Sequence, residues 1–128
     1  MEHIEHMKRI EEFMLNEKKF IYFDLSDYKD KNEIMNFIET AKLIIAKYGD
    51  NSVYTITNIE NIIFNAEIVE IFNKWTEYDK RYVKYAAVIG FSALRKLMAA
   101  SVFEKSQREN VYYAESKIQA IEYLLAHG

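Results

Sequence analysis

The sequence contains no cysteine and no proline, and its three glycines lie far apart, at positions 49, 90 and 128. The absence of cysteine excludes disulfides, thiolate catalysis and zinc sites with cysteine ligands. Isolated glycines cannot form a phosphate-binding loop of the GxxxxGK[ST] or GxGxxG type. These absences remove several common chemistries before any residue is assigned a role.

The chain also lacks an excess of basic residues and a long apolar run. Its 17 Lys and Arg against 20 Asp and Glu give a net charge of −3, whereas a general nucleic-acid binder usually carries a basic stripe. No segment reaches the roughly 18 apolar residues that a membrane helix needs. Charged and apolar residues alternate near the start, unlike a secretory signal. We therefore expect no nucleic-acid partner, no transmembrane segment and a cytoplasmic location.

Half of the 128 residues are hydrophobic and 15% are aromatic, so the chain can bury a core of ordinary size. We expect one domain over residues 1–128, with an N-terminal helix over 1–16 and an α/β core over 20–128. β-Branched and aromatic runs predict four strands, at 20–25, 52–57, 82–89 and 110–114. Apolar residues at spacings of three and four predict helices at 31–48, 65–78, 92–104 and 116–126.

The same helical spacing predicts the amphipathic N-terminal helix, from Ile4, Met7, Ile10, Phe13 and Met14. Because a helix separates each strand of the core from the next, we expect right-handed crossovers and a mostly parallel sheet. Helices should cover both faces of this sheet.

Three stretches add a more specific pattern: residues 22–26 (Tyr-Phe-Asp-Leu-Ser), 55–58 (Thr-Ile-Thr-Asn) and 86–96 (Ala-Ala-Val-Ile-Gly-Phe-Ser-Ala-Leu-Arg-Lys). With the order of elements and the final helix, they resemble the STAS/SEC14-like proteins, which are relatives of the sporulation anti-anti-sigma factor. The resemblance implies a four-stranded sheet in the order 2-1-3-4. It also implies a regulatory protein-interaction domain. The family's phosphorylatable serine has no counterpart, since residues 62–66 read Ile-Ile-Phe-Asn-Ala.

In that strand order the direction of winding reverses between the first and third strands. Open α/β sheets bind ligands at such a point, outside the carboxyl ends of the strands. The candidate ligand- or anion-binding residues near these strand ends are Asp24, Ser26, Asp27, Asn58, Gly90, Phe91, Ser92 and Arg95.

Each of these candidates also has a simpler interpretation. The helix start at Ser92 could bind an anion, but Gly90 and Ser92 are also what a turn and an N-cap require. Asp24 and Asp27 could bind a metal or act as acid and base, but short acids equally make solvated turns. Gly90-Phe91-Ser92 matches only the first part of the esterase pattern GxSxG, and no histidine follows until His127. We therefore expect no enzyme, no metal and no cofactor.

A further set of apolar residues could line a ligand groove or a dimer interface, or could simply fill the core. It consists of Phe72, Trp75, Tyr78 and Met98. The function that we expect is a non-catalytic regulatory module that binds a protein partner or itself, as a homodimer. The alternative is a carrier or sensor of a small apolar or anionic, lipid-like ligand, bound in the crevice near Ser26 and residues 90–92.

Overall fold

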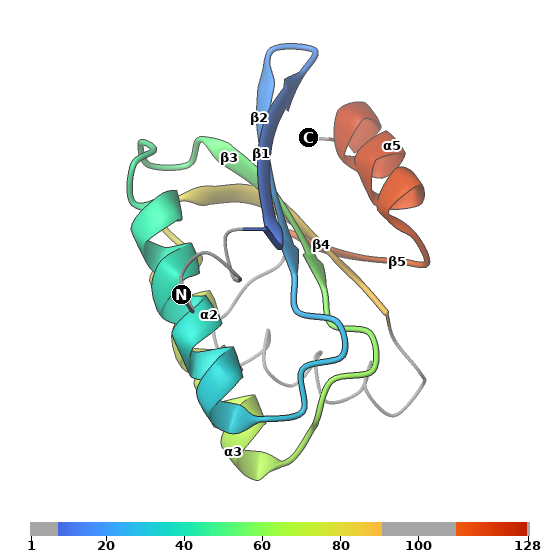
Figure 1. Cartoon of the computed structure of the whole chain (residues 1–128). Helices are drawn as coiled ribbons and strands as arrows, with labels where there is room; N and C mark the ends of the chain where they lie inside the picture. The colour runs from blue at the N-terminus through green and yellow to red at the C-terminus, as the bar shows by residue number, and fades with distance from the viewer. Residues whose placement is uncertain (1–7, 91–109, 128) are drawn as a thin grey trace.

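The computed structural model describes residues 8–90 and 110–127 (Figure 1). Along the described chain the elements are β1 (Ile10–Leu15), β2 (Lys18–Asp24), α2 (Lys31–Ile45), β3 (Val53–Asn58), α3 (Ala66–Asp79), β4 (Val83–Ile89), β5 (Val111–Ala114) and α5 (Lys117–His127). The strands form one sheet in the order β1-β2-β3-β4-β5. β1 is antiparallel to β2, and every other neighbouring pair is parallel. The α/β class and the mostly parallel sheet are confirmed, but the sheet has five strands and not four.

The fifth strand is β1, which lies where the sequence predicts part of a helix. Its chain turns through Asn16 and Glu17, at φ 49° and 67°, and this two-residue turn pairs Leu15 with Lys18. Two successive positive φ angles are typical of the tight turns that join antiparallel strands. The predicted helix over 1–16 is therefore wrong for residues 10–15, and residues 1–7 lie outside the described part.

The helical spacing of Ile10 and Phe13 has a different meaning in a strand. Residues three apart on a strand point to opposite faces. Ile10 packs against the core under α2 and α3, whereas Phe13 packs against the core under α5. The ring of Phe13 stacks on Phe20 of β2, with centroids 5.2 Å apart. Ile10 and Phe13 thus pack into different cores, and their spacing of three is not the mark of a helix here.

The expected strand order 2-1-3-4 is also wrong. It would place β2 between β3 and β4, but β3 lies between β2 and β4. The physical reason is the hairpin, because β1 already occupies the side of β2 on which β4 would have to pair. The parallel strands follow one another across the sheet without a reversal. The crevice expected at a switch point between β2 and β4 therefore does not exist.

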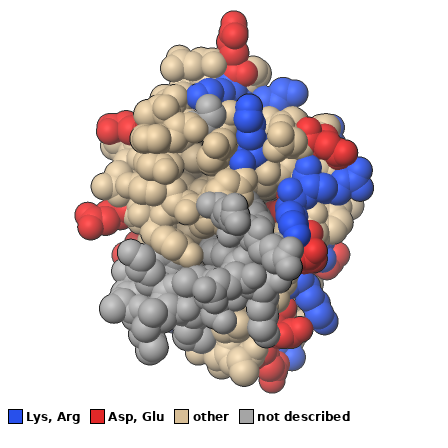
Figure 2. All heavy atoms as spheres, turned by 180° about the vertical axis from the view of Figure 1, so that it is seen from behind, with Lys and Arg blue, Asp and Glu red and all other residues tan. Residues whose placement is uncertain are grey.

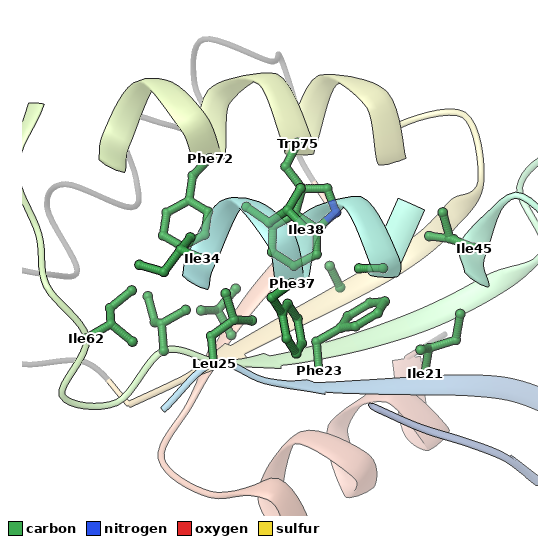
Figure 3. Close-up of a cluster of buried hydrophobic side chains, with 14 of the residues drawn as sticks. Ile21, Phe23, Leu25, Ile34, Phe37, Ile38, Ile45, Ile62, Phe72 and Trp75 are labelled. Carbon is green, nitrogen blue, oxygen red and sulfur yellow. The ribbon is translucent and has the colours of Figure 1, made fainter. Parts of the chain in front are cut away.

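The helices cover both faces of the sheet (Figure 1). α2 and α3 pack side by side on one face, and α5 packs on β3, β4 and β5 from the other. β2 alternates accordingly: Ile21 and Phe23 point to α2 and α3 (Figure 3), while Phe20 belongs to the core under α5. The large apolar side chains of β2 thus contribute to two cores, one on each face of the sheet.

Helices α2 and α3 begin at polar caps supplied by the preceding loops. Asp30 Oδ1 accepts a hydrogen bond from the Asn32 amide at 2.8 Å, and Asn65 Oδ1 accepts one from the Ile68 amide at 3.0 Å. Such caps satisfy backbone donors that have no partner within the helix. The helices predicted at 31–48, 65–78 and 116–126 correspond to α2, α3 and α5, and the one predicted at 92–104 lies outside the described residues.

In the described ranges, none of the helices combines the length and the apolar character that crossing a membrane requires.

The turn at Glu17 gives a test of the β1–β2 hairpin. Glycine adopts positive φ without the steric cost that other residues meet there, so Glu17→Gly should raise the free energy of unfolding by about 0.5–1 kcal/mol. Glu17→Ala, which keeps the Cβ, is the control and should have little effect. Urea unfolding followed by circular dichroism measures both. A destabilising Glu17→Gly would contradict the turn.

Candidate functional site

The carboxyl ends of β2 and β3 lie side by side, because the strands are parallel neighbours in which Asp24 pairs with Asn58. Residues 25–30 leave β2 and residues 59–65 leave β3, and we call these two segments the carboxyl-end loops. Backbone pairing continues into them: the Leu25 amide donates to the Asn58 carbonyl at 2.8 Å, and the Asp27 amide donates to the Glu60 carbonyl at 2.9 Å. The two loops therefore behave as an extension of the sheet.

The tips of the loops are joined by side chains. Asp27 and Asn61 both have positive φ, 68° and 58°, a conformation that Asp and Asn tolerate better than most residues. Asn61 Nδ2 donates to Asp27 Oδ1 at 2.9 Å. Lys29 Nζ in turn donates to Asn61 Oδ1 at 3.0 Å and to the Asn61 carbonyl. This exposed cluster links the two tips directly.

The first loop is also held at its base. Asp24 Oδ1 accepts a hydrogen bond from the Ser26 amide at 2.9 Å, which is a local turn of the Asx type. Arg9 Nη1 donates to the Ser26 carbonyl at 2.7 Å, and its guanidinium carbon lies 4.2 Å from the ring centroid of Tyr28. The side chain of Asp24 and the backbone of Ser26 thus serve to fix the loop.

Asn58 uses both ends of its amide within the protein. Its Oδ1 accepts from the Glu60 amide at 2.9 Å, and its Nδ2 donates to the Tyr22 hydroxyl at 3.2 Å. Burial raises the pKa of the Tyr22 phenol above its usual value, which favours the neutral form of the phenol. The Lys117 ammonium lies 4.3 Å from the centroid of this ring. Asn58 therefore connects the loops to the face of the sheet that α5 covers.

Gly90 follows β4 and touches the second loop. Its φ is 96°, and a Cβ placed on it would lie 2.4 Å from the backbone nitrogen of Glu60. Next to it, the Ile59 amide donates to the Ile89 carbonyl at 3.0 Å. Only glycine combines this φ with so close an approach. Gly90 thus follows β4 in direct contact with the second loop, while Phe91, Ser92 and Arg95 lie outside the described residues.

The predicted apolar set does not form one exposed groove. Phe72 and Trp75 are buried, and Trp75 packs edge-on against Phe23 with centroids 5.5 Å apart (Figure 3). Tyr78 is 37% exposed and contacts Tyr82, with centroids 5.8 Å apart. Met98 lies outside the described residues. Two members of the set therefore fill the core, and one lies on the surface.

The side chains that could bind a metal ion are dispersed over the described part of the chain. Within residues 8–90 and 110–127, no three side chains of the types His, Asp and Glu are grouped so that they could hold a metal ion. On the face seen in Figure 2, acidic and basic side chains are interspersed along one side.

Sequence reasoning located part of this site and missed part of it. Asp24, Ser26, Asp27, Asn58 and Gly90 do come together, although the strand order behind that expectation is wrong. The residues that it missed are Arg9, Tyr28, Glu60 and Asn61. Asn61 lies in a polar turn that the sequence marks plainly, whereas Arg9 precedes a strand that was expected to be helical.

No protein-family model, curated protein or solved structure matches this chain. The resemblance to STAS/SEC14-like proteins therefore remains a prediction.

The contact of Gly90 with Glu60 gives a test of the site's architecture. Gly90→Ala adds a Cβ where the φ is unfavourable and the backbone of Glu60 is too close, so it should lower the free energy of unfolding by about 2–4 kcal/mol. Gly49→Ala is the control, because a Cβ at Gly49 would have nothing within 4 Å. Denaturant titration compares the two variants. Equal stabilities would show that the loop does not pack against Gly90.

Proposed function

We propose that the protein is a non-catalytic regulatory module that binds a protein partner through the carboxyl-end loops. The observation that carries the proposal is the way the two loops are bonded to each other. Backbone hydrogen bonds donated by the amides of Leu25, Asp27 and Ile63 connect the two segments. The side chains of Asp27, Lys29 and Asn61 link the tips of the loops. Lys29 and Glu60 are exposed residues on these loops.

Such a surface is well suited to a protein partner. Binding costs free energy when loops must be ordered on contact, and loops that are already fixed avoid much of that cost. Interfaces formed by preorganised surfaces change little on association. The rim is charged and contains both signs, at Lys29 and Glu60, which favours selection of a partner by charge complementarity.

The polar side chains at the base of the loops hold the loops in place. One oxygen of the Asp24 carboxylate accepts from the Ser26 amide, and both ends of the Asn58 amide are engaged. The sequence motifs that resemble those of anti-anti-sigma factors also favour a regulatory role, although the strand order that the resemblance implies differs from the observed one. Because Asn65 caps α3 where that family has a serine turn, we propose a partner exchange that does not use phosphoserine.

The carrier or sensor of a small ligand is the second candidate, and it has less support. Asp24 and Asn58, two of the candidate ligand-binding residues, already form hydrogen bonds that shape the loops. No other observation at the loops favours a small molecule over a protein.

The test begins with cross-linking in intact cells to obtain the partner, followed by calorimetry with the purified pair. Glu60→Lys reverses a charge on the loop rim, and the backbone hydrogen bond of Glu60 remains. We expect the dissociation constant to rise about tenfold or more. Glu122→Lys makes the same change on α5, across the sheet from α2 and α3, and should leave the affinity within about twofold.

Two results would contradict the proposal. One is a partner whose affinity is indifferent to Glu60→Lys. The other is a pair of observations: native mass spectrometry finds a small molecule bound to the protein, and no partner protein cross-links to the protein in cells. This result would favour the carrier.

A further inference from the structure

β1 is the outermost strand of the described sheet, and its outer edge carries backbone donors and acceptors. The Asp24 amide donates to the Arg9 carbonyl at 2.8 Å, which fixes the alternation of the antiparallel ladder. Every second residue from Arg9 onward, through Phe13, therefore bonds to β2. The backbone groups of Ile10, Glu12 and Met14 point away from β2. An edge of this kind is a template for another strand.

Charged side chains are one of the features that protect natural edges, and in β1 each of the two glutamates pairs with a lysine of the same chain. Lys117 Nζ lies 2.7 Å from Glu11 Oε1, and Lys47 Nζ lies 3.2 Å from Glu12 Oε1. Beyond these two glutamates the strand ends in apolar side chains. Met14 is 61% exposed and Leu15 is 38% exposed. The two glutamates therefore protect this edge less against pairing with another strand than their charge alone suggests.

A row of aromatic rings crosses the sheet and stops at this edge. Phe13, Phe20, Tyr54 and Tyr85 are register partners on four neighbouring strands. Their successive centroids lie 5.2, 5.5 and 6.3 Å apart. Cross-strand aromatic pairs of this kind stabilise a sheet. Phe13, the last of the row, is only partly buried and has a neighbouring ring on one side.

We propose that a second copy of this chain pairs with β1 in antiparallel orientation, with Phe13 opposite Phe13 of the second copy. In this register Glu12 faces Met14 of the other copy, and Glu11 faces Leu15. No glutamate opposes a glutamate. The aromatic row continues across the two-fold axis, with four rings from each copy, and the outward backbone groups of Glu12 and Met14 bond to one another.

Charge and symmetry favour a second copy in this register. A shift by two residues in one direction would place Glu12 opposite Glu12, a like-charge pair that destabilises a sheet. A shift by two in the other direction would place Glu11 opposite Glu17 and Phe13 opposite Leu15, which ends the aromatic row. A two-fold axis at Phe13 gives each copy the same contacts, as closed dimers require. This inference rests on β1 and not on the carboxyl-end loops, so its failure would leave the proposed function standing.

Single cysteines test the register, because the chain has no cysteine of its own. Opposed residues without mutual hydrogen bonds have Cα atoms about 4.5 Å apart, which suits a disulfide. Phe13→Cys should therefore form a covalent dimer under mild oxidation. Leu15→Cys is the matched control from the same strand and face. In the proposed register the Cα atoms at position 15 of the two copies would lie about 14 Å apart, so this variant should not cross-link. Non-reducing electrophoresis separates the outcomes, and equal cross-linking of both variants, or none of Phe13→Cys, overturns the proposal.

Substitutions of the exposed Met14 test the same pairing without touching the aromatic row. Met14→Glu would face Glu12 of the other copy, so the dimer dissociation constant should rise about tenfold. Met14→Lys would face the same glutamate with opposite charge and should keep or strengthen the dimer. Sedimentation equilibrium measures both, with circular dichroism to verify folding. A wild-type protein that stays monomeric at about 1 mM, far above the working range of a specific interface, overturns the proposal. So does an equal effect of the two substitutions.

Discussion

The pairing of β2 on both of its sides is the constraint on which the rest of the structure depends. A two-residue turn brings β1 onto one side in antiparallel orientation, and β3 takes the other side in parallel orientation. β4 must then pair beyond β3. Successive crossovers in one direction place α2 and α3 on the same face of the sheet. The other face is left to the aromatic row and to α5, and β1 becomes an outer edge.

The same constraint brings the polar residues together. Because β2 and β3 are parallel neighbours, the loops that follow them start side by side and continue the pairing for several residues. Gly90 closes this arrangement from β4, since only a residue without a side chain can lie so near Glu60. The carboxyl-end loops are therefore rigid because of strand order, and their outer side chains remain exposed. Surface loops that are already ordered would lose little conformational freedom on binding.

The sequence predicts those parts of the fold whose signals are local. Continuous apolar runs, such as residues 86–89, mark buried strands, and a spacing of three and four marks α2 and α3. The sequence does not predict β1, because Ile10 and Phe13 have a helical spacing although they pack into two different cores. The bond between Asp27 and Asn61 joins residues 34 positions apart, and it depends on a strand order that no local pattern fixes. The candidate residues of the site could thus be found, but their partners could not.

Hydrogen exchange of the loop amides tests the central claim most directly. The claim is that the carboxyl-end loops are held as firmly as the strands that they follow. Native-state exchange measured by NMR on the full chain reports the opening of each backbone bond. The amides of Leu25, Asp27 and Ile63, which donate across the loops, should exchange as slowly as those inside β3. Exchange at the rate of an unstructured peptide would contradict the claim and remove the basis for a preformed docking surface.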